Sequence, residues 1–157
     1  MNLFVESHQK LLQLLRKAEV DFIIIGGYSV IFHGYARTTG DIDIWLKPDN
    51  VNKAKLLQAL RWYGIEEDSL GELNQLDFAK TVFFKIGDVP ERIDFLTKIN
   101  LIDYETANRE KVLANLDDIT IPFLHLNHLI LSKLNTGRPQ DQADIEMLQK
   151  IQKNKKN

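Results

Sequence analysis

A chain of 157 residues, 44% hydrophobic and 27% charged, has the composition of an ordinary globular protein, which excludes a chain that is disordered throughout. Its formal net charge of -2 provides no general attraction for nucleic acid, and the absence of cysteine excludes disulfides and thiolate metal sites. We expect one domain over residues 1–157. Because there is no signal-peptide pattern and no apolar run of about 20 residues, we also expect a cytoplasmic protein with no membrane contact.

The first 46 residues predict a helix followed by two strands. Apolar residues at helical spacing indicate an amphipathic helix over residues 3–19. Phe22–Ile25 is a β-branched and aromatic run typical of a short strand, and Gly26-Gly27 stops it. One or two helical turns and a polar loop at residues 37–40 then lead into a second strand over Asp41–Leu46.

Two aspartates lie on this second strand. Successive side chains of a strand point to opposite faces, so Asp41 and Asp43 share one face. Two carboxylates held side by side repel each other unless a cation lies between them. A divalent metal ion is the simplest such cation, and the pattern therefore indicates a metal site.

The Gly-Gly turn is a second candidate feature. A junction of strand, glycine turn and helix exposes backbone N–H groups that can bind an anion, and Gly26, Gly27 and the hydroxyl of Ser29 fit that description. Neither standard glycine-rich phosphate motif is present, so a plain tight turn is the alternative. Nearby, Arg37 can pair with a phosphate or with one of the two aspartates, and His33 can be a turn residue or a substrate contact.

The middle of the chain predicts scaffold followed by a loop. Asp49 can cap a helix that Gly64 ends, with an apolar stripe at Ala54, Leu57 and Leu60. Residues 65–77 are acidic and without periodicity, and they predict a loop.

A hairpin follows, with strands predicted over residues 81–86 and 92–96. On its second strand, Asp94 lies on the opposite face from its two apolar neighbours. If this strand pairs with the one that carries Asp41 and Asp43, all three carboxylates can converge. The alternative is an aspartate on an edge strand that faces water.

The last third of the chain is expected to be mainly helical. Residues 103–116 predict a charged helix, and residues 119–122 predict a short extended segment that Pro122 keeps away from the centre of a sheet. His125 and His128 read as ordinary helix residues because no metalloprotease motif accompanies them.

One lysine stands out in that region. Lys133 falls on the apolar face of a helix, where lysine is rare without a partner. Pro139 is suited to begin the next helix, on which Asp141 and Asp144 share the apolar face. A structural ion pair of these aspartates with Lys133 or Arg138 is one interpretation, and cations that reach a phosphate are the other.

Jointly, these motifs resemble the nucleotidyltransferase superfamily related to DNA polymerase β. The resemblance rests on the Gly-Gly turn, the Asp-x-Asp strand about a dozen residues later and the third aspartate, Asp94. The run from Gly26 to Ile44, GGYSVIFHGYARTTGDIDI, and the segment Leu129 to Asp144 are similar to the minimal bacterial branch that includes AbiEii-type toxins. One departure is that much of the superfamily has Gly-Ser at the turn, whereas here Gly27 takes the second position and Ser29 follows.

The resemblance implies an α+β nucleotidyltransferase fold, a small mixed β-sheet flanked by helices. We expect a sheet-bearing core at about residues 20–100, a helical C-terminal segment at about 101–152 and a frayed tail at 153–157.

The resemblance also implies the site and the reaction. The metal-binding and catalytic set, for one or two Mg²⁺ (or Mn²⁺) ions, would be Asp41, Asp43 and Asp94, with Asp94 as the base. The nucleotide-binding set would be Gly26, Gly27, Ser29, Arg37 and Lys133. A hydroxyl of RNA, a protein or a small molecule would attack the α-phosphate of an NTP, and a cognate antitoxin or toxin is an expected partner. The alternative is a regulatory module that keeps the fold without turnover.

Overall fold

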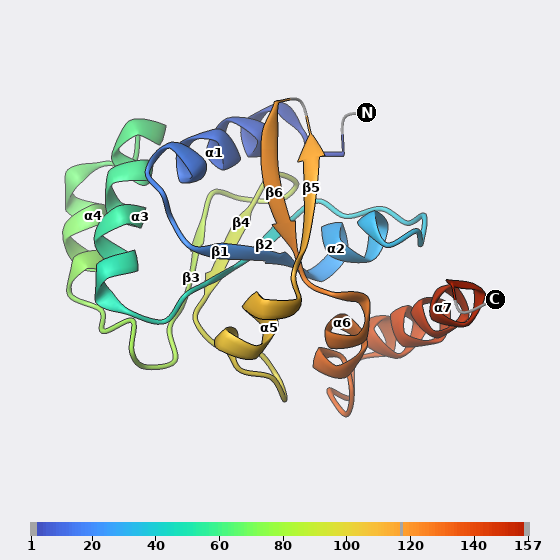
Figure 1. Cartoon of the computed structure of the whole chain (residues 1–157). Helices are drawn as coiled ribbons and strands as arrows, with labels where there is room; N and C mark the ends of the chain where they lie inside the picture. Colours follow the sequence, from blue (N-terminus) through green and yellow to red (C-terminus); the bar gives the residue numbers. More distant parts are fainter. Residues whose placement is uncertain (1–2, 117, 156–157) are drawn as a thin grey trace.

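The computed structural model describes residues 3–116 and 118–155, which build a six-stranded mixed sheet with helices on both faces (Figure 1). The order of strands across the sheet is β3-β4-β2-β1-β6-β5. The strands are β1 (Phe22–Ile25), β2 (Ile42–Leu46), β3 (Phe83–Ile86), β4 (Ile93–Leu96), β5 (Val112–Leu116) and β6 (Ile119–Phe123). Pairs β2–β4 and β1–β6 are parallel, and pairs β1–β2, β3–β4 and β5–β6 are antiparallel.

The helices divide between the two faces of the sheet. They are α1 (Glu6–Lys17), α2 (Gly26–Phe32), α3 (Asn50–Tyr63), α4 (Glu67–Asn74), α5 (Tyr104–Glu110), α6 (Leu126–Ser132) and α7 (Pro139–Lys155). One hydrophobic core joins α1, α3 and α4 to one face, and a second core joins α5, α6 and α7 to the other. None of the helices in the described part of the chain is both long and apolar enough to cross a membrane.

Strand alternation decides which side chains meet each core. Ile42 and Ile44 of β2 enter the core under α1 and α3, whereas Trp45 enters the core under α5 and α6. Asp43 is two residues before Trp45 and therefore lies on the same face as α5 to α7. The site consequently forms on that face.

Several predicted elements are confirmed. The N-terminal helix, the first strand, the second strand and the hairpin strands all form, although Asp41 lies just before β2 rather than in it. The Asp49 carboxylate caps α3 by accepting a hydrogen bond from the Asn52 N–H at 2.7 Å, and Gly64 ends α3 in the left-handed conformation. The predicted stripe of α3 is partly wrong, since Ala54 is exposed and the buried apolar residues are Leu56, Ala59 and Leu60.

Residues 65–77 are not the predicted loop. They contain α4, whose Leu70 and Leu73 are buried in the core that also holds α3. Two leucines three residues apart make one apolar edge, and this edge forms a helix only because α3 is there to cover it. The sequence window alone lacks that partner.

The prediction for residues 103–116 is also partly wrong, because α5 ends at Glu110 and residues 112–116 form β5. The extended segment predicted over residues 119–122 forms as β6, but β6 lies one strand in from the edge, between β1 and β5, although Pro122 was expected to keep it away from the centre of a sheet. The proline is tolerated there because β6 pairs with β1 only beyond it, in the register of Ile24 with Phe123. At the C-terminus, α7 remains helical through Lys155 where a frayed tail was predicted, and residues 156–157 lie outside the described part.

Candidate active site

The parallel pairing of β2 with β4 brings two of the predicted aspartates together. Asp43 and Asp94 are register partners, as the sequence predicted, and their side chains share one face. Asp94 is 5% exposed. The Asp43 carboxylate lies against Gly26, where an added Cβ would be 2.0 Å from Asp43 Oδ2, and Gly26 has a φ of +68°. A glycine is therefore required beside this carboxylate.

Asp41 joins the site through an arginine. Arg92 Nη2 lies 2.7 Å from Asp41 Oδ2, and Arg92 Nε lies 2.9 Å from Asp94 Oδ1. The guanidinium thus bridges Asp41 and Asp94. Arg92 was not predicted as a site residue. It lies just before β4 and two residues before Asp94, a spacing within the predicted strand of residues 92–96 that could have identified it.

Asp43 carries an electrostatic cost. Burial first, and then the charges of Asp94 and Asp41, raise the pKa of Asp43 from its ordinary value of 3.8 to about 7. The charge of Lys133 opposes this rise. The carboxylate is therefore held where additional positive charge would stabilise it.

The donor set suits a divalent cation only in part. Carboxylate oxygens are the ligands that Mg²⁺ prefers, and Asp41 Oδ1 is buried with no hydrogen-bond partner among the described residues. Within residues 3–116 and 118–155, however, no three acidic, histidine or cysteine side chains gather closely enough to hold an ion. The side chains instead lie in a row. Asp43 is next to Asp94, Asp94 pairs with Arg92, and Arg92 pairs with Asp41. Asp43 and Asp94 fit a cation, and Asp41 can join them once Arg92 releases it.

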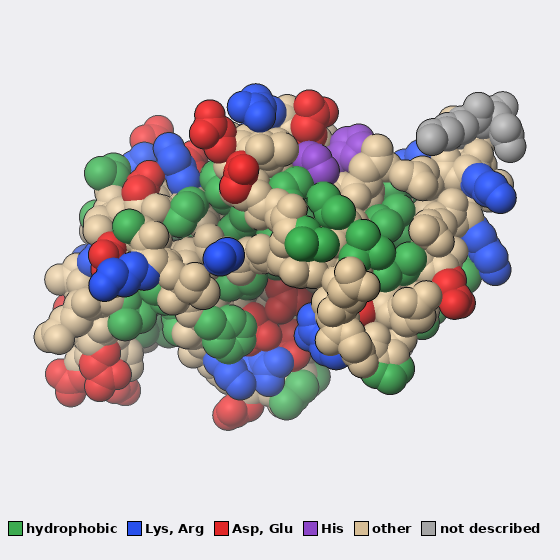
Figure 2. Space-filling view, turned by 90° about the horizontal axis from the view of Figure 1, so that it is seen from below, with side chains coloured by type: hydrophobic (Ala, Val, Ile, Leu, Met, Phe, Trp, Pro, Cys, Tyr) green, Lys and Arg blue, Asp and Glu red, His purple; other side chains and the backbone are tan. Residues whose placement is uncertain are grey.

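Asp43 and Asp94 line a cleft of about 620 Å³, here called the aspartate cleft, whereas Asp41 is not part of its lining. Figure 2 shows acidic side chains within a hollow that lysine and arginine side chains flank. Its polar and glycine lining includes Gly26, Gly27, Arg37, Asp43, Arg92, Asp94, Lys98, Lys133, Arg138 and Asp141. Acids at the base and cations around them form a place suited to a metal-bound polyanion.

The predicted Gly-Gly turn is the first turn of α2, which begins at Gly26. Both glycines line the aspartate cleft, and an added Cβ on Gly27 would be 2.5 Å from Thr39 Oγ1. Ser29 is fully buried within α2 and is not part of the cleft lining. The backbone at the turn is thus open to the cleft, and the Ser29 hydroxyl is not.

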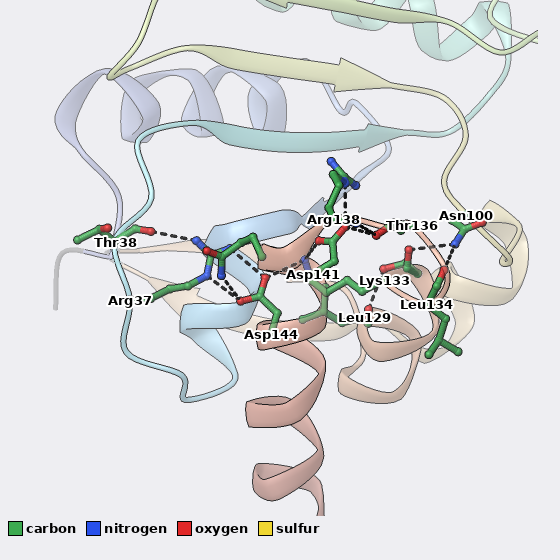
Figure 3. Close-up of polar contacts among 12 residues, drawn as sticks. Arg37, Thr38, Asn100, Leu129, Lys133, Leu134, Thr136, Arg138, Asp141 and Asp144 are labelled. Atoms are coloured by element: carbon green, nitrogen blue, oxygen red, sulfur yellow. Dashed lines mark hydrogen bonds and ion pairs between the residues drawn. The ribbon is translucent and has the colours of Figure 1, made fainter.

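A buried charge network borders the cleft (Figure 3). Lys133 Nζ lies 3.1 Å from both Asp141 Oδ1 and Asp144 Oδ2, so the ion pair, one of the two interpretations of the sequence, forms in the structure. Arg37 Nε lies 3.1 Å from Asp144 Oδ1, so its aspartate partner is Asp144 and neither Asp41 nor Asp43. Lys133 and Arg37 nevertheless still line the cleft.

The histidines have structural contacts. The His33 ring is 7% exposed, and its Nε2 donates to the Leu124 carbonyl oxygen at 2.7 Å, as suits a turn residue. His125 Nδ1 accepts a hydrogen bond from the Asn127 N–H at 3.0 Å at the start of α6.

Comparison with known proteins agrees with this arrangement. Residues 3–153 match the family described as "Nucleotidyltransferase of unknown function (DUF6036)". The fold is similar to that of the lincosamide antibiotic adenylyltransferase LnuA with bound lincomycin, at 20% identity and a TM-score of 0.57, over 96% of this chain and 99% of that chain. It is also similar to a nucleotidyltransferase-type protein of Thermotoga maritima, at 15% identity and a TM-score of 0.58, over 91% of this chain and 90% of that chain. No curated protein matches the sequence. These similarities confirm the predicted nucleotidyltransferase fold.

Proposed function

Since this chain belongs to the nucleotidyltransferase family DUF6036, we propose that its single domain transfers a nucleoside monophosphate from an NTP to an acceptor hydroxyl, with Mg²⁺ (or Mn²⁺), in the aspartate cleft. The observation that carries this proposal is the register of Asp43 opposite Asp94 beside Gly26. Buried paired carboxylates are costly, and a functional site is where such a cost is usually found.

Different residues of the aspartate cleft would bind the metal ion and the phosphates. Asp43 and Asp94, together with Asp41, would hold the metal ion, which when bound supplies positive charge to the attacking and leaving oxygens. Gly26 and Gly27 line the cleft, where their backbone would contact the phosphates.

Asp94 would take the proton of the acceptor hydroxyl. The hydroxyl oxygen forms a bond to the α-phosphorus, the bond from that phosphorus to the oxygen that bridges to the β-phosphate breaks, and pyrophosphate leaves. Lys98, Lys133 and Arg138 line the same cleft and balance the charge of the triphosphate.

A narrower role is part of the proposal. The motif from Gly26 to Ile44 resembles AbiEii-type toxins. This resemblance supports a toxin that acts on a cellular acceptor and is held in check by a cognate antitoxin.

The test uses NTPs labelled at either the α-phosphate or the γ-phosphate, incubated with Mg²⁺ and total cell extract. We expect α-label to become attached to an acceptor and γ-label to be released as pyrophosphate. Asp94→Asn should lower transfer by about 100-fold or more, the scale of losing one catalytic acid or base. Asp88→Asn, an exposed aspartate in the turn between β3 and β4, is the matched control and should keep wild-type transfer.

Transfer of the γ-label to an acceptor, or equal activity of Asp94→Asn and wild type, would contradict the proposal. If the fold serves only as a regulatory module, neither label should be transferred and no NTP should raise the melting temperature in Mg²⁺.

A further inference from the structure

A second cleft of about 770 Å³ adjoins the aspartate cleft on the same face of the sheet. The two clefts share Lys98 and Ile99 in their lining. The second cleft is bounded by the segment before β3, the end of β2 and the segment that leads from β4 into α5, with Trp45, Ala79, Lys80, Leu101, Ile102 and Tyr104 among its residues.

Strand register fixes how far this cleft lies from the aspartates. Trp45 follows Asp43 by two residues on the same face of β2, and its register partner on β4 is Leu96. Two residues along a strand correspond to about 7 Å. A molecule that rests on Trp45 can therefore extend a hydroxyl group to Asp94.

The floor of the second cleft has an unusual chemistry. The rings of Trp45 and Tyr104 pack edge to face with centroids 5.2 Å apart, and the two residues are 1% and 6% exposed. Trp45 Nε1 and the Tyr104 hydroxyl are buried and have no hydrogen-bond partner among the described residues. Buried polar side-chain atoms usually have a partner, so two unpaired donors beneath one cleft call for an explanation. Burial also raises the pKa of Tyr104, which keeps its hydroxyl a donor.

The charges around the second cleft change along its length. Lys80 and Lys98 line it with positive charge, and Lys98 is at the border with the aspartate cleft. Beyond Tyr104 a further hollow continues, lined by Lys47 and by the carboxylates of Asp49, Asp103 and Glu105, so that negative charge exceeds positive charge there. The phosphates of an RNA strand that continued in that direction would meet these carboxylates, and this disfavours a nucleic-acid acceptor.

We propose that the second cleft is the acceptor site, and that the acceptor is a hydroxyl-bearing small molecule whose apolar body packs on Leu101 and Ile102, above the floor that Trp45 and Tyr104 form. The second cleft has the size of a small-molecule site, and like such sites it combines apolar surface with a few hydrogen-bonding groups. This inference rests on the proposed function, since it assigns the acceptor of that same reaction.

The test fills the cleft without touching the aspartates. Ala79 is exposed and lines the second cleft, whereas Ala54 is exposed on α3 and lies elsewhere. Wild type, Ala79→Trp and Ala54→Trp are each incubated with α-labelled NTPs, Mg²⁺ and three separate fractions of cell extract, namely RNA, protein and the small-molecule ultrafiltrate. Products are separated by chromatography so that free nucleoside monophosphate is not counted.

We expect wild type and Ala54→Trp to label a compound in the ultrafiltrate, and Ala79→Trp to label it about 100-fold less because the hydroxyl is displaced. All three proteins should show the same rise in melting temperature with NTP and Mg²⁺, since the aspartate cleft is unchanged. Tyr104→Phe serves as a second variant, because it keeps the ring, and it should raise the KM for the acceptor without lowering the melting temperature.

Equal transfer by Ala79→Trp and Ala54→Trp would overturn the acceptor site. Label found in RNA or protein and not in the ultrafiltrate would overturn the small-molecule acceptor and leave the proposed function intact. No label in any fraction with wild type would instead refute the proposed function, and this inference with it.

Discussion

Asp43 holds a carboxylate where its surroundings oppose its negative charge. Burial and the charge of Asp94 raise its pKa to about 7, and Gly26 leaves the carboxylate the room it needs. Removing the carboxylate would relieve this cost, so the protein retains it at the expense of stability. At the scale of a single residue, this is the strongest indication of a site that binds a cation.

The raised pKa makes a prediction for the metal-free protein. The folded state binds a proton at Asp43 more tightly than the unfolded state does, so stability falls as the pH rises between about 4 and about 7. Asp43→Asn should remove this part of the fall, which is on the order of a few kcal/mol. Urea unfolding in EDTA across this pH range measures it. Asp68→Asn, an exposed aspartate of α4, should keep the wild-type profile, and an Asp43→Asn profile that also matches wild type would contradict the burial of this charge.

Gly26 gives a second prediction at the scale of the residue. Gly26→Ala places a Cβ 2.0 Å from Asp43 Oδ2 at a φ of +68°, so it should lower stability by about 1–3 kcal/mol and weaken NTP binding. Gly71→Ala in α4 meets nothing within 4 Å, and it should stabilise the protein by about 0.5–1 kcal/mol. Thermal unfolding compares the two. Equal effects of the two substitutions would show that Asp43 does not lie against Gly26.

Between elements, the Lys133 network attaches the C-terminal helices to the loop that leads into β2. Asp144 of α7 is fully buried and receives both Lys133, at the end of α6, and Arg37, from the loop. One wall of the aspartate cleft therefore depends on the ion pair of Arg37 with Asp144, which are 107 residues apart in the sequence, and on the local pair of Lys133 with Asp144.

Lys133→Met tests this attachment. The substitution leaves the buried Asp144 with Arg37 but without Lys133 as a cationic partner. We therefore expect the free energy of unfolding to fall by about 3 kcal/mol, or the melting temperature by roughly 10 °C. Lys153→Met, at an exposed position of α7, should change little. An unchanged melting temperature together with weaker NTP binding would mean that Lys133 acts on phosphate and does not hold α7 in place.

Some helices and strands could be predicted from the local sequence, and others could not. The first two strands, the hairpin and the caps of α3 were predictable because a short run of residues carries each signal. By contrast, α4, β5 and β6 depend on distant partners, since α3 covers Leu70 and a single register pair with β1 accommodates Pro122. At the site, the pairing of Asp43 with Asp94 could be predicted, whereas the capture of Asp41 by Arg92 requires the turn between β3 and β4 to be placed in space.

At the scale of the whole molecule, the two faces of the sheet differ, since one is covered by α1, α3 and α4 and the other carries both clefts. The core under α1, α3 and α4 packs on one face of the sheet, and α5 to α7 lie on the other (Figure 1). The aspartate cleft and the second cleft are both lined by residues on the side of α5 to α7. This division would let one rigid sheet position the nucleotide and the acceptor side by side. We therefore infer that the Asp43–Asp94 pair is a metal and nucleotide site.

The most direct test of that claim compares the thermal unfolding of wild type and Asp43→Asn, first in EDTA and then with Mg²⁺ and each of the four NTPs. In EDTA at neutral pH the variant should be more stable than wild type, by an amount on the order of a few kcal/mol, because the cost of ionising the buried Asp43 carboxylate is gone. With Mg²⁺ and the preferred NTP the order should reverse, since only wild type gains the binding term, about 4.1 kcal/mol at 1,000 times the Kd. If the variant is instead less stable than wild type by the same amount in both conditions, Asp43 is a structural partner and the metal site is refuted.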